Sequence, residues 1–364
     1  MSFTRCSRCV MPNTRPGITF NEEGVCSACQ SHENRKNVDW DARYQELKTL
    51  CDKHRRDDGK WDCIIAVSGG KDSTYQVKVM KEDMGMNPLL VNVSNFSSTD
   101  AGRRNYRNML ETFDCECLSL DLSPATAKKM FRYSLETYGS PTWYWDRAVY
   151  TYPLWIAKKF DIPLLVYGEN ISYEYGGPGA EDTPSALGQL QNAVANAYTP
   201  DDFFDAGVEW NRTYIVHPPA ELDKVEPVYL SYFVPWSGTR NMLVAKAYGF
   251  KELAHWEERA GYIEQYDQID AIGYLVHCWM KYPKYGHARV TDVASYWIRE
   301  GLVSRQRAME LVRKEDYKLD HNVRDDFCAF CGYTETQFQH VIDDWYNPAI
   351  FEQIEGQWVH IESR

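Results

Sequence analysis

The chain has 364 residues, enough for one large domain or two ordinary ones. Hydrophobic residues make up 44% and charged residues 25%, the balance of a globular protein in water. The net charge of −12 argues against nucleic acid as a partner, because a protein that binds nucleic acid needs a basic surface. A local basic patch is still compatible with this net charge. No apolar run approaches the roughly 20 residues of a membrane span, and the N-terminus lacks the apolar core of a secretion signal. We therefore expect a cytoplasmic protein with no membrane contact.

Two Cys-x-x-Cys pairs open the chain, Cys6 with Cys9 and Cys26 with Cys29. Each pair can place two thiolates about 3.7 Å apart on one side of a metal ion, and two pairs complete a tetrahedron. So short a segment has no core of its own and would need the metal to fold. The spacing predicts a zinc-ribbon-like unit over residues 1–36 with structural Zn²⁺. A redox dithiol pair and an iron–sulfur site are the alternatives, whereas a disulfide framework is not expected from 11 cysteines, an odd number.

A charged stretch of helical pattern over residues 37–60 leads into the segment on which the chain is organised. A short apolar strand at 63–67 ends in Ser-Gly-Gly-Lys-Asp-Ser at positions 68–73, and residues 75–81 are helical in pattern. A strand, a glycine turn and a helix start form a geometry that binds phosphate, because backbone N–H groups and the helix N-terminus face the anion. Glycine lets those N–H groups approach without a Cβ in the way.

The side chains of this loop suit the same ligand. Lys71 can neutralise phosphate, Ser68 and Ser73 can donate hydrogen bonds, and Asp72 can hold Mg²⁺. The loop is not the Walker type, because Ile65 and Asp72 stand where that pattern needs a glycine and a Ser or Thr. The alternative to a phosphate site is a surface turn rich in small polar residues.

The hexapeptide instead resembles the pyrophosphate loop of the PP-loop ATP pyrophosphatases. The resemblance implies cleavage of ATP between its α and β phosphates, with an oxygen adenylated and AMP displaced by a nitrogen or sulfur nucleophile. It also implies that the ATP site includes Val67, Ser68, Gly69, Gly70, Lys71, Asp72 and Ser73.

Further strands and helices alternate after this loop. Strands are predicted at 88–93, 115–120 and 162–167, with helices at 103–113 and 153–160. Such alternation predicts an α/β fold with a parallel sheet and helices on both faces. Ligands of such sheets bind at the carboxyl ends of the strands, which would bring residues 68–73, 92–95 and 168–170 to one rim.

The PP-loop resemblance implies roles for this rim. Val93 and Ser94 would lie beside the adenine, and Gly168 would close the nucleotide site. Glu169 and Asn170 would be catalytic, facing the substrate amide or a second magnesium ion. A helix cap is the alternative for Asn170.

Residues 171–228 are the least regular part, and such an insertion can hold a substrate, act as a lid or contact another subunit. A strand predicted at 229–236 enters a helix that ends at Gly249. Arg240 stands near the start of that helix, where PP-loop enzymes can have a basic residue that contacts phosphate. A solvated helix charge is the alternative.

The final third, from Tyr262, is mostly helical in pattern and carries a locally basic run. Basic side chains in an acidic chain suit an anionic small substrate such as a sugar phosphate or sugar carboxylate. The candidate substrate-binding residues are His277, Lys281, Lys284, His287 and Arg289. A solvated helical face is the alternative, and no residue is clearly marked as a general base, for which His277, His287 and Glu169 are the candidates.

Taken in order, these features resemble the N-acetyl sugar amidotransferase family of bacterial surface-polysaccharide and nonulosonic-acid (pseudaminic, legionaminic) biosynthesis. The shared features include Tyr-Gly-Glu-Asn at 167–170, Trp236, Lys-Tyr-Gly-His-Ala-Arg at 284–289 and Thr-Asp at 291–292. The resemblance implies ATP- and Mg²⁺-dependent conversion of an acetamido group of an anionic sugar into an acetamidino group, with AMP and pyrophosphate released. We see no glutaminase constellation of Cys, His and Glu, so a separate glutaminase would supply ammonia.

The domain organisation follows from this order. We expect a PP-loop ATP pyrophosphatase domain over residues 37–255, with the insertion at 171–228, and a mainly helical substrate or partner region over 256–364. Cys328 and Cys331 form an additional pair not expected of the family and are interpreted as small core residues. With the ribbon and the loop, that pair also resembles tRNA-thiolating enzymes, the main alternative, which the negative charge disfavours. A non-catalytic nucleotide-binding scaffold is the third hypothesis, disfavoured by the intact Lys71.

Overall fold

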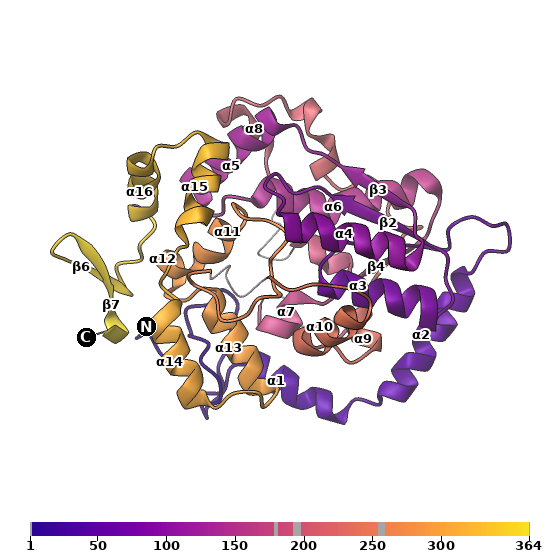
Figure 1. Ribbon diagram of the computed structural model, residues 1–364, viewed down its shortest axis with the longest axis horizontal. Coiled ribbons are helices and arrows are strands. Elements are labelled where there is room, and N and C mark those ends of the chain that lie inside the picture. Colours follow the sequence, from indigo (N-terminus) through magenta and orange to yellow (C-terminus); the bar gives the residue numbers. More distant parts are fainter. Residues whose placement is uncertain (1, 178–180, 192–197, 254–258, 364) are drawn as a thin grey trace.

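The computed structural model describes residues 2–177, 181–191, 198–253 and 259–363 (Figure 1). Its centre is a parallel sheet of five strands in the order β3-β2-β1-β4-β5. The strands are β1 (Cys63–Ala66), β2 (Pro88–Val93), β3 (Cys117–Leu120), β4 (Leu164–Tyr167) and β5 (Glu226–Tyr229). The predicted parallel α/β architecture is confirmed. Because β1 pairs with both β2 and β4, the loops that follow these three strands meet at one edge.

Neighbouring residues of β1 pack against opposite layers. Ile65 belongs to a core with helices α2, α3 and α4, whereas Ile64 belongs to a core with α6. This alternation follows from the two-residue period of a strand, and it explains why the strand is apolar on both faces. The helices of these layers are α2 (Trp40–His54), α3 (Lys71–Val77), α4 (Asp100–Phe113) and α6 (Trp143–Phe160).

The remaining helices cover the ends and the rim of the sheet. They are α1 (Ser27–Asn34), α5 (Pro124–Tyr138), α7 (Ile171–Tyr175), α8 (Pro200–Asp205), α9 (Leu230–Phe233) and α10 (Gly238–Ala247). The C-terminal region consists of α11 (Leu275–Trp279), α12 (Lys281–Tyr285), α13 (Arg289–Arg299), α14 (Arg305–Glu315), α15 (His321–Cys331), α16 (Glu335–Asp343) and the hairpin of β6 (Phe351–Ile354) and β7 (Gln357–His360). The predicted helical C-terminal region is confirmed, with this hairpin as an unpredicted addition.

Three elements differ from the sequence prediction. The strand expected at 229–236 is β5, which ends at Tyr229 beside the end of β4, and the chain then turns into α9. Helix α6 begins at Trp143, well before the predicted start at Pro153, which lies in the interior of the helix. Helix α5 was not predicted at all. The buried residues of α5 do recur at the three- and four-residue spacing of a helix, a signal that the sequence prediction missed. The apolar and aromatic run that contains β5 and α9 is short, and such runs do not separate strand from helix.

The N-terminal cysteine unit packs against the C-terminal region (Figure 1). Arg305 of α14 donates to the backbone carbonyl of Cys9 (3.0 Å), and Arg5 forms an ion pair with Glu362 (2.7 Å). The unit is therefore part of one packed structure, and its boundary at residue 36 stays a prediction, as does the boundary at 255. No helix in the described ranges has the length and apolar character needed to cross a membrane.

Candidate functional site

The loop between β1 and α3 adopts a conformation that only glycine allows. Gly69 has φ of +86°, and a Cβ on it would lie 2.7 Å from the Cα of Tyr106. The N–H of Ser68 donates to Oγ of Ser73 (2.8 Å), which closes the turn. Gly70 is the N-cap of α3 and provides no side-chain cap, so the first N–H groups of the helix remain available to an anion.

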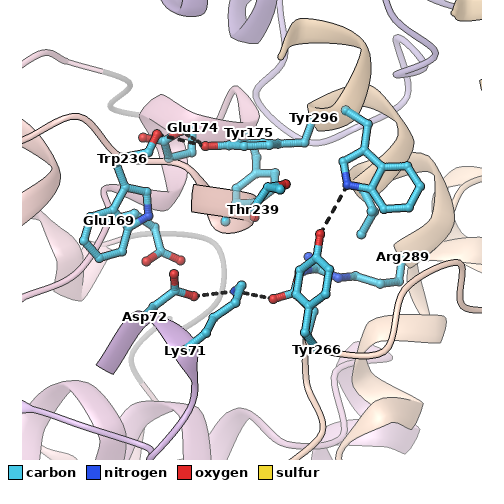
Figure 2. Close-up of a pocket in the computed structure, with 14 residues that line it drawn as sticks. Lys71, Asp72, Glu169, Glu174, Tyr175, Trp236, Thr239, Tyr266, Arg289 and Tyr296 are labelled. Carbon is cyan, nitrogen blue, oxygen red and sulfur yellow. Dashed lines mark hydrogen bonds and ion pairs between the residues drawn. The ribbon is translucent and has the colours of Figure 1, made fainter. Parts of the chain in front are cut away.

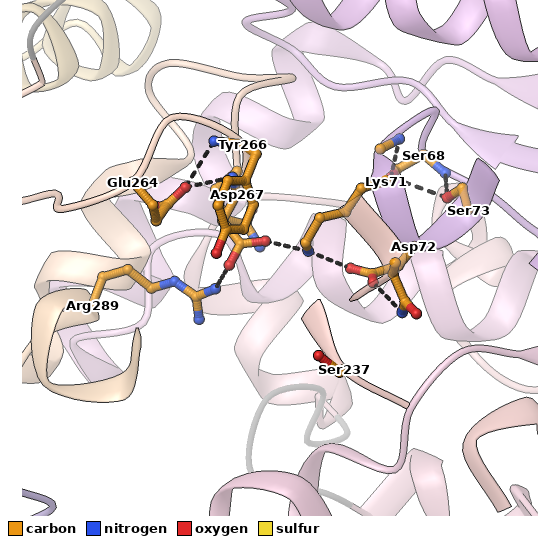
Figure 3. Close-up of polar contacts among 12 residues, drawn as sticks. Ser68, Lys71, Asp72, Ser73, Ser237, Glu264, Tyr266, Asp267 and Arg289 are labelled. Carbon is orange, nitrogen blue, oxygen red and sulfur yellow. Dashed lines mark hydrogen bonds and ion pairs between the residues drawn. The ribbon is translucent and has the colours of Figure 1, made fainter. Parts of the chain in front are cut away.

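Lys71 lies at the centre of a buried chain of charges (Figure 3). Its side chain is 6% exposed, and Nζ donates to Oδ2 of Asp72 (2.6 Å) and to Oδ1 of Asp267. The other carboxylate oxygen of Asp267 accepts from the guanidinium of Arg289 (2.6 Å). Oδ1 of Asp72 accepts from Nδ2 of Asn241 (2.8 Å). The phosphate loop is thus joined to the C-terminal region through Asp267.

These partners keep Lys71, Asp267 and Arg289 ionised. Burial alone would lower the pKa of Lys71, but the charges of Asp267 and Asp72 raise it well above its usual value. Burial would raise the pKa of Asp267, yet Lys71 and Arg289 hold it well below its usual range. Asp267 therefore presents to Lys71 a negative oxygen of the kind that a phosphate presents.

Glu169, directly after β4, faces Asp72 across the same hollow (Figure 2). Burial, reinforced by the charge of Asp72, raises the pKa of Glu169 to about 7. Mg²⁺ is bound in proteins by one or two carboxylates together with substrate phosphates. The pair beside the phosphate loop fits that requirement, and a cation there would relieve the repulsion between the two carboxylates.

Most predicted site residues line one cavity of about 420 Å³. Those that line it are Val67, Ser68, Gly69, Gly70, Lys71, Asp72, Ser73, Val93, Gly168, Glu169, His277, Lys281 and Arg289. A smaller hollow of about 40 Å³ shares Lys71 and Glu169 with it and extends to Trp236 and Tyr296 (Figure 2). The structure therefore brings the phosphate loop and three of the five predicted substrate residues together.

The other two predicted substrate residues lie outside the cavity lining. Lys284 donates to the backbone carbonyls of Tyr138 (3.2 Å) and Gly139 (3.1 Å), where it holds the end of α5. Burial lowers the pKa of Lys284 to about 8. His287 is fully buried, its ring nitrogens have no hydrogen-bond partner within the described ranges, and burial lowers its pKa to about 3. Both positions fit a structural role.

Three other predicted site residues, two of the rim and Arg240, also lie apart from the cavity lining. Asn170 caps α7 by accepting from the N–H of Tyr173 (3.3 Å), which is the alternative considered for it. Oγ of Ser94 is 3.0 Å from Oγ of Ser119. Arg240, in the first turn of α10, is exposed to solvent.

Several cavity residues had no signal in the sequence. Asp267 lies in a segment without a motif, and Asp146 lies inside a helix that was only half predicted. Arg15 comes from the loop between the two cysteine pairs, and its Nη1 forms an ion pair with Asp292 (2.8 Å), which also binds Lys281. Asp292 alone could have been noticed in the sequence, because it is an acidic residue within the basic run.

The four N-terminal cysteines form a compact thiol cluster. Sγ of Cys9 is 3.7 Å from Sγ of Cys26, Sγ of Cys6 is 4.0 Å from Sγ of Cys29, and all four atoms lie within 4.8 Å of one another. Four thiolates around one zinc ion are about 3.7 Å apart, so the cluster fits a tetrahedral metal. All four side chains are buried, and the set leaves no open coordination position for catalysis.

Cys328 and Cys331 do not form a second cluster in the described part of the chain. Both are buried at the end of α15, and burial raises the pKa of Cys328 to about 11 and of Cys331 to about 12. Thiols with such pKa values stay protonated near neutral pH and are poor nucleophiles. Their interpretation as small core residues agrees with this packing.

The structure is a parallel α/β fold with a cavity beside a glycine loop, and that loop has the geometry of a phosphate site. Residues 260–363 match the family described as the C-terminal domain of LPS biosynthesis protein WbpG-like proteins. The match covers less than a third of the chain, so this region is similar to that family, in agreement with the resemblance to surface-polysaccharide proteins noted in the sequence.

Other known proteins resemble the chain more distantly. An uncharacterized protein of Methanocaldococcus jannaschii is 27% identical over 118 residues, or 32% of this chain and 42% of that protein, so the match spans less than half of the relative. The NH₃-dependent NAD synthetase of Campylobacter jejuni aligns with a TM-score of 0.32, 14% identity, and coverage of 47% of this chain and 73% of that one. The U34-tRNA thiolase NcsA of Methanococcus maripaludis, with its [4Fe-4S] cluster, aligns with a TM-score of 0.28 and 10% identity, and the alignment covers 91% of this chain and 96% of that one. Overlaps this weak support no conclusion about activity.

Proposed function

We propose that this protein is an ATP-dependent amidotransferase that acts on an N-acetylated, anionic sugar in surface-polysaccharide biosynthesis. It adenylates the acetamido oxygen, releases pyrophosphate, and lets ammonia displace AMP to give an acetamidino sugar. One observation carries the proposal: a single cavity has the phosphate loop on one side and cationic residues of the LPS-family region on the other.

The nucleotide side of the cavity supports AMP-forming chemistry. The loop at 68–73 offers backbone N–H groups and Lys71 to the β and γ phosphates, which leave as pyrophosphate. Mg²⁺, held by Asp72 and Glu169, would supply charge neutralisation on the phosphates. Lys71 and Arg289 reach the same hollow and would stabilise the negative charge that develops during transfer.

The opposite side of the cavity suits an anionic sugar. Lys281 and Arg289 bring positive charge, and both are held by buried carboxylates, Asp292 and Asp267. Aromatic rings also line the cavity, including Tyr175, and such rings stack on sugar faces. A carboxylate or phosphate of the substrate would bind to the two cations.

The reaction follows from the weakness of an amide as an electrophile. Bond formation between the acetamido oxygen and the α phosphorus expels pyrophosphate, the amide nitrogen loses its proton to water, and an O-adenyl imidate remains. The nitrogen of ammonia then bonds to the imidate carbon, and the C–O bond breaks with its electron pair going to AMP. A separate glutaminase partner would supply the ammonia.

Two further parts of the proposal concern the cysteines. The N-terminal cluster would hold Zn²⁺ as a structural ion. The tRNA-thiolating alternative has less support, because that chemistry needs a reactive thiol, and Cys328 and Cys331 are buried with raised pKa values.

The decisive experiment incubates purified protein with ATP, Mg²⁺, ammonium and a panel of acetamido nucleotide sugars and sialic-acid-like sugars. Release of AMP and pyrophosphate, with a sugar product in which NH has replaced an oxygen atom by mass spectrometry, supports the proposal and identifies the substrate. ADP as the nucleotide product would overturn the adenylation step. AMP release that requires tRNA and a sulfur donor would favour the thiolating alternative.

A further inference from the structure

A second pair of ionisable side chains lines the same cavity, and the reaction above does not yet use it. Asp146 of α6 is 3% exposed, and its Oδ2 lies 3.8 Å from Nδ1 of His277 on α11. Helix α6 packs on the central sheet, whereas α11 belongs to the region that matches the LPS family. The pair therefore exists only where these two parts of the protein meet.

The surroundings of the pair fix both side chains. The hydroxyl of Thr142 donates to Oδ2 of Asp146 (2.7 Å), and the hydroxyl of Tyr274 donates to Oδ1 (3.1 Å). The ring of Tyr274 also stacks on the imidazole of His277, with centroids 5.6 Å apart and planes at 26°. Oriented groups of this kind are what proton transfer requires.

The orientation of the imidazole separates its two nitrogens. Nδ1 of His277 is buried, has no hydrogen-bond partner in the described part of the chain, and lies 3.8 Å from Oδ2 of Asp146. Nε2 is then the nitrogen left for a ligand in the cavity. A separation of 3.8 Å is long for a hydrogen bond, but such contacts tighten when the substrate binds.

The two groups of the pair have pKa values that are pushed apart. Burial raises the pKa of Asp146 to about 7, against the donors Thr142 and Tyr274. Burial and the charges of Lys281 and Lys284 lower the pKa of His277 to about 3. Together the pair takes up one proton near neutral pH and no second one. The titratable groups that act on the pair are Tyr198, Tyr274, Cys278, Lys281 and Lys284.

We propose that Asp146 and His277 form the proton acceptor for the ammonia nucleophile, an inference that rests on the proposed function. When the nitrogen of ammonia bonds to the imidate carbon, the adduct carries a positive nitrogen that would leave again more readily than AMP. Transfer of one proton from that nitrogen to Nε2 of His277 prevents the reversal, while Asp146 holds the hydrogen on Nδ1. The C–O bond to AMP then breaks, a neutral amidine forms, and the pair releases its proton to water.

In this assignment His277 meets the reacting atoms and Asp146 is a positioning residue. The test compares His277→Gln and Asp146→Asn with the wild type, and it separates the two half-reactions. Sugar-dependent exchange of labelled pyrophosphate into ATP reports adenylation, and mass spectrometry reports the amidine. His340→Gln, at an exposed position on α16, is the matched control and is expected to behave as the wild type.

His277→Gln is expected to keep the exchange within about twofold and to lose amidine formation from ammonium by about 10²-fold or more. Hydroxylamine, whose adduct loses its proton to water without help, is expected to restore product formation. In the wild type, with the concentration of free ammonia held constant and Mg²⁺ saturating, amidine formation should rise as the pH increases through about 7, because only the proton-free pair accepts a proton. Asp146→Asn should keep the exchange and lose that inflection.

Loss of the exchange in folded His277→Gln, or failure of hydroxylamine to restore its product, overturns the proton-acceptor role. So does amidine formation at wild-type rates in both variants. A wild type that shows no exchange with any sugar of the panel overturns the proposed function itself, and this inference with it.

Discussion

The two walls of the cavity were built in different ways. The wall at the phosphate loop comes from six consecutive residues, 68–73, which run from the loop after β1 into the first turn of α3, and their identities alone predicted it. The opposite wall collects Arg15, Asp146, Asp267 and Arg289 from four separate segments. The geometry of a contiguous motif is set by local turns and helix ends, so it can be predicted from sequence. A wall that forms by packing of distant segments has no such local pattern and cannot be predicted in this way. The predictions below test whether the walls also differ in what they do.

Replacement of Lys71 should have the largest effect on activity. Lys71→Ala removes the charge that faces the phosphates, so the rate of pyrophosphate release is expected to fall about 10²- to 10³-fold, as for other single groups that stabilise a transition state. Lys78→Ala is the control, because Lys78 pairs with Asp83 outside the cavity lining. A steady-state assay of pyrophosphate release measures both, and near-wild-type activity of Lys71→Ala would remove the phosphate-loop assignment.

Loss of the metal should affect stability more than chemistry. Cys26→Ser removes one of four ligands from a unit that has almost no other core, so we expect the bound zinc to be lost and the melting temperature to fall by on the order of 10 °C. Cys51→Ser, at a buried cysteine outside the cluster, is the control for thiol removal alone. Metal analysis and thermal unfolding measure the two effects. The prediction would be contradicted if the purified wild type contained no metal and Cys26→Ser had the same melting temperature as the wild type.

Asp267→Asn should separate the two walls. The substitution removes the carboxylate that occupies Lys71, so inorganic pyrophosphate should bind several-fold more tightly by calorimetry. It also leaves Arg289 without its buried partner, so the free energy of unfolding should fall by about 3 kcal/mol. Asp100→Asn, at an exposed site, should change neither quantity. Weaker pyrophosphate binding would mean that Asp267 supports Lys71 instead of competing for it.

Glu169 should make Mg²⁺ binding depend on pH in a predictable direction. Its pKa is raised to about 7, and only the ionised carboxylate binds the cation, so Mg²⁺ affinity should rise as the pH increases through about 7. Below that value the affinity should fall by up to about tenfold per pH unit. Calorimetric titration with Mg²⁺ in the presence of pyrophosphate measures this, and Glu169→Gln should flatten the dependence. An unchanged pH dependence in that variant would assign the titration to another group.

The comparison of the two walls also explains which elements and site residues could be predicted from the sequence. The strand β2 was predicted with its observed bounds, and the phosphate loop and four cysteines with the roles that their geometry now fits. Lys284 and His287 looked like substrate residues because they stand in a basic run. Lys284 is instead bound to the end of α5, and His287 is buried in the segment after α12. Both placements result from tertiary packing, which the pattern of one chain segment does not contain.

Asp267 has the same origin. Asp267 contacts Lys71 only because its segment, 196 residues further along the chain, folds over the phosphate loop. No local period or motif marks such a residue, since nothing in its own neighbourhood differs from a surface turn. The contact is made by tertiary packing, which becomes visible only in three dimensions.

The buried pair of Lys71 and Asp267 has a consequence for how ATP would enter. The charge of Lys71 is already neutralised by Asp267. Binding of ATP would therefore replace the ion pair with Asp267 by an ion pair with a phosphate, and the net electrostatic attraction would be small. The surface as a whole is negative, with a net charge of −12, and would not draw an anion in from a distance. Nucleotide affinity should therefore vary only weakly with ionic strength, and selectivity for ATP would come from the shape and hydrogen bonds of the loop.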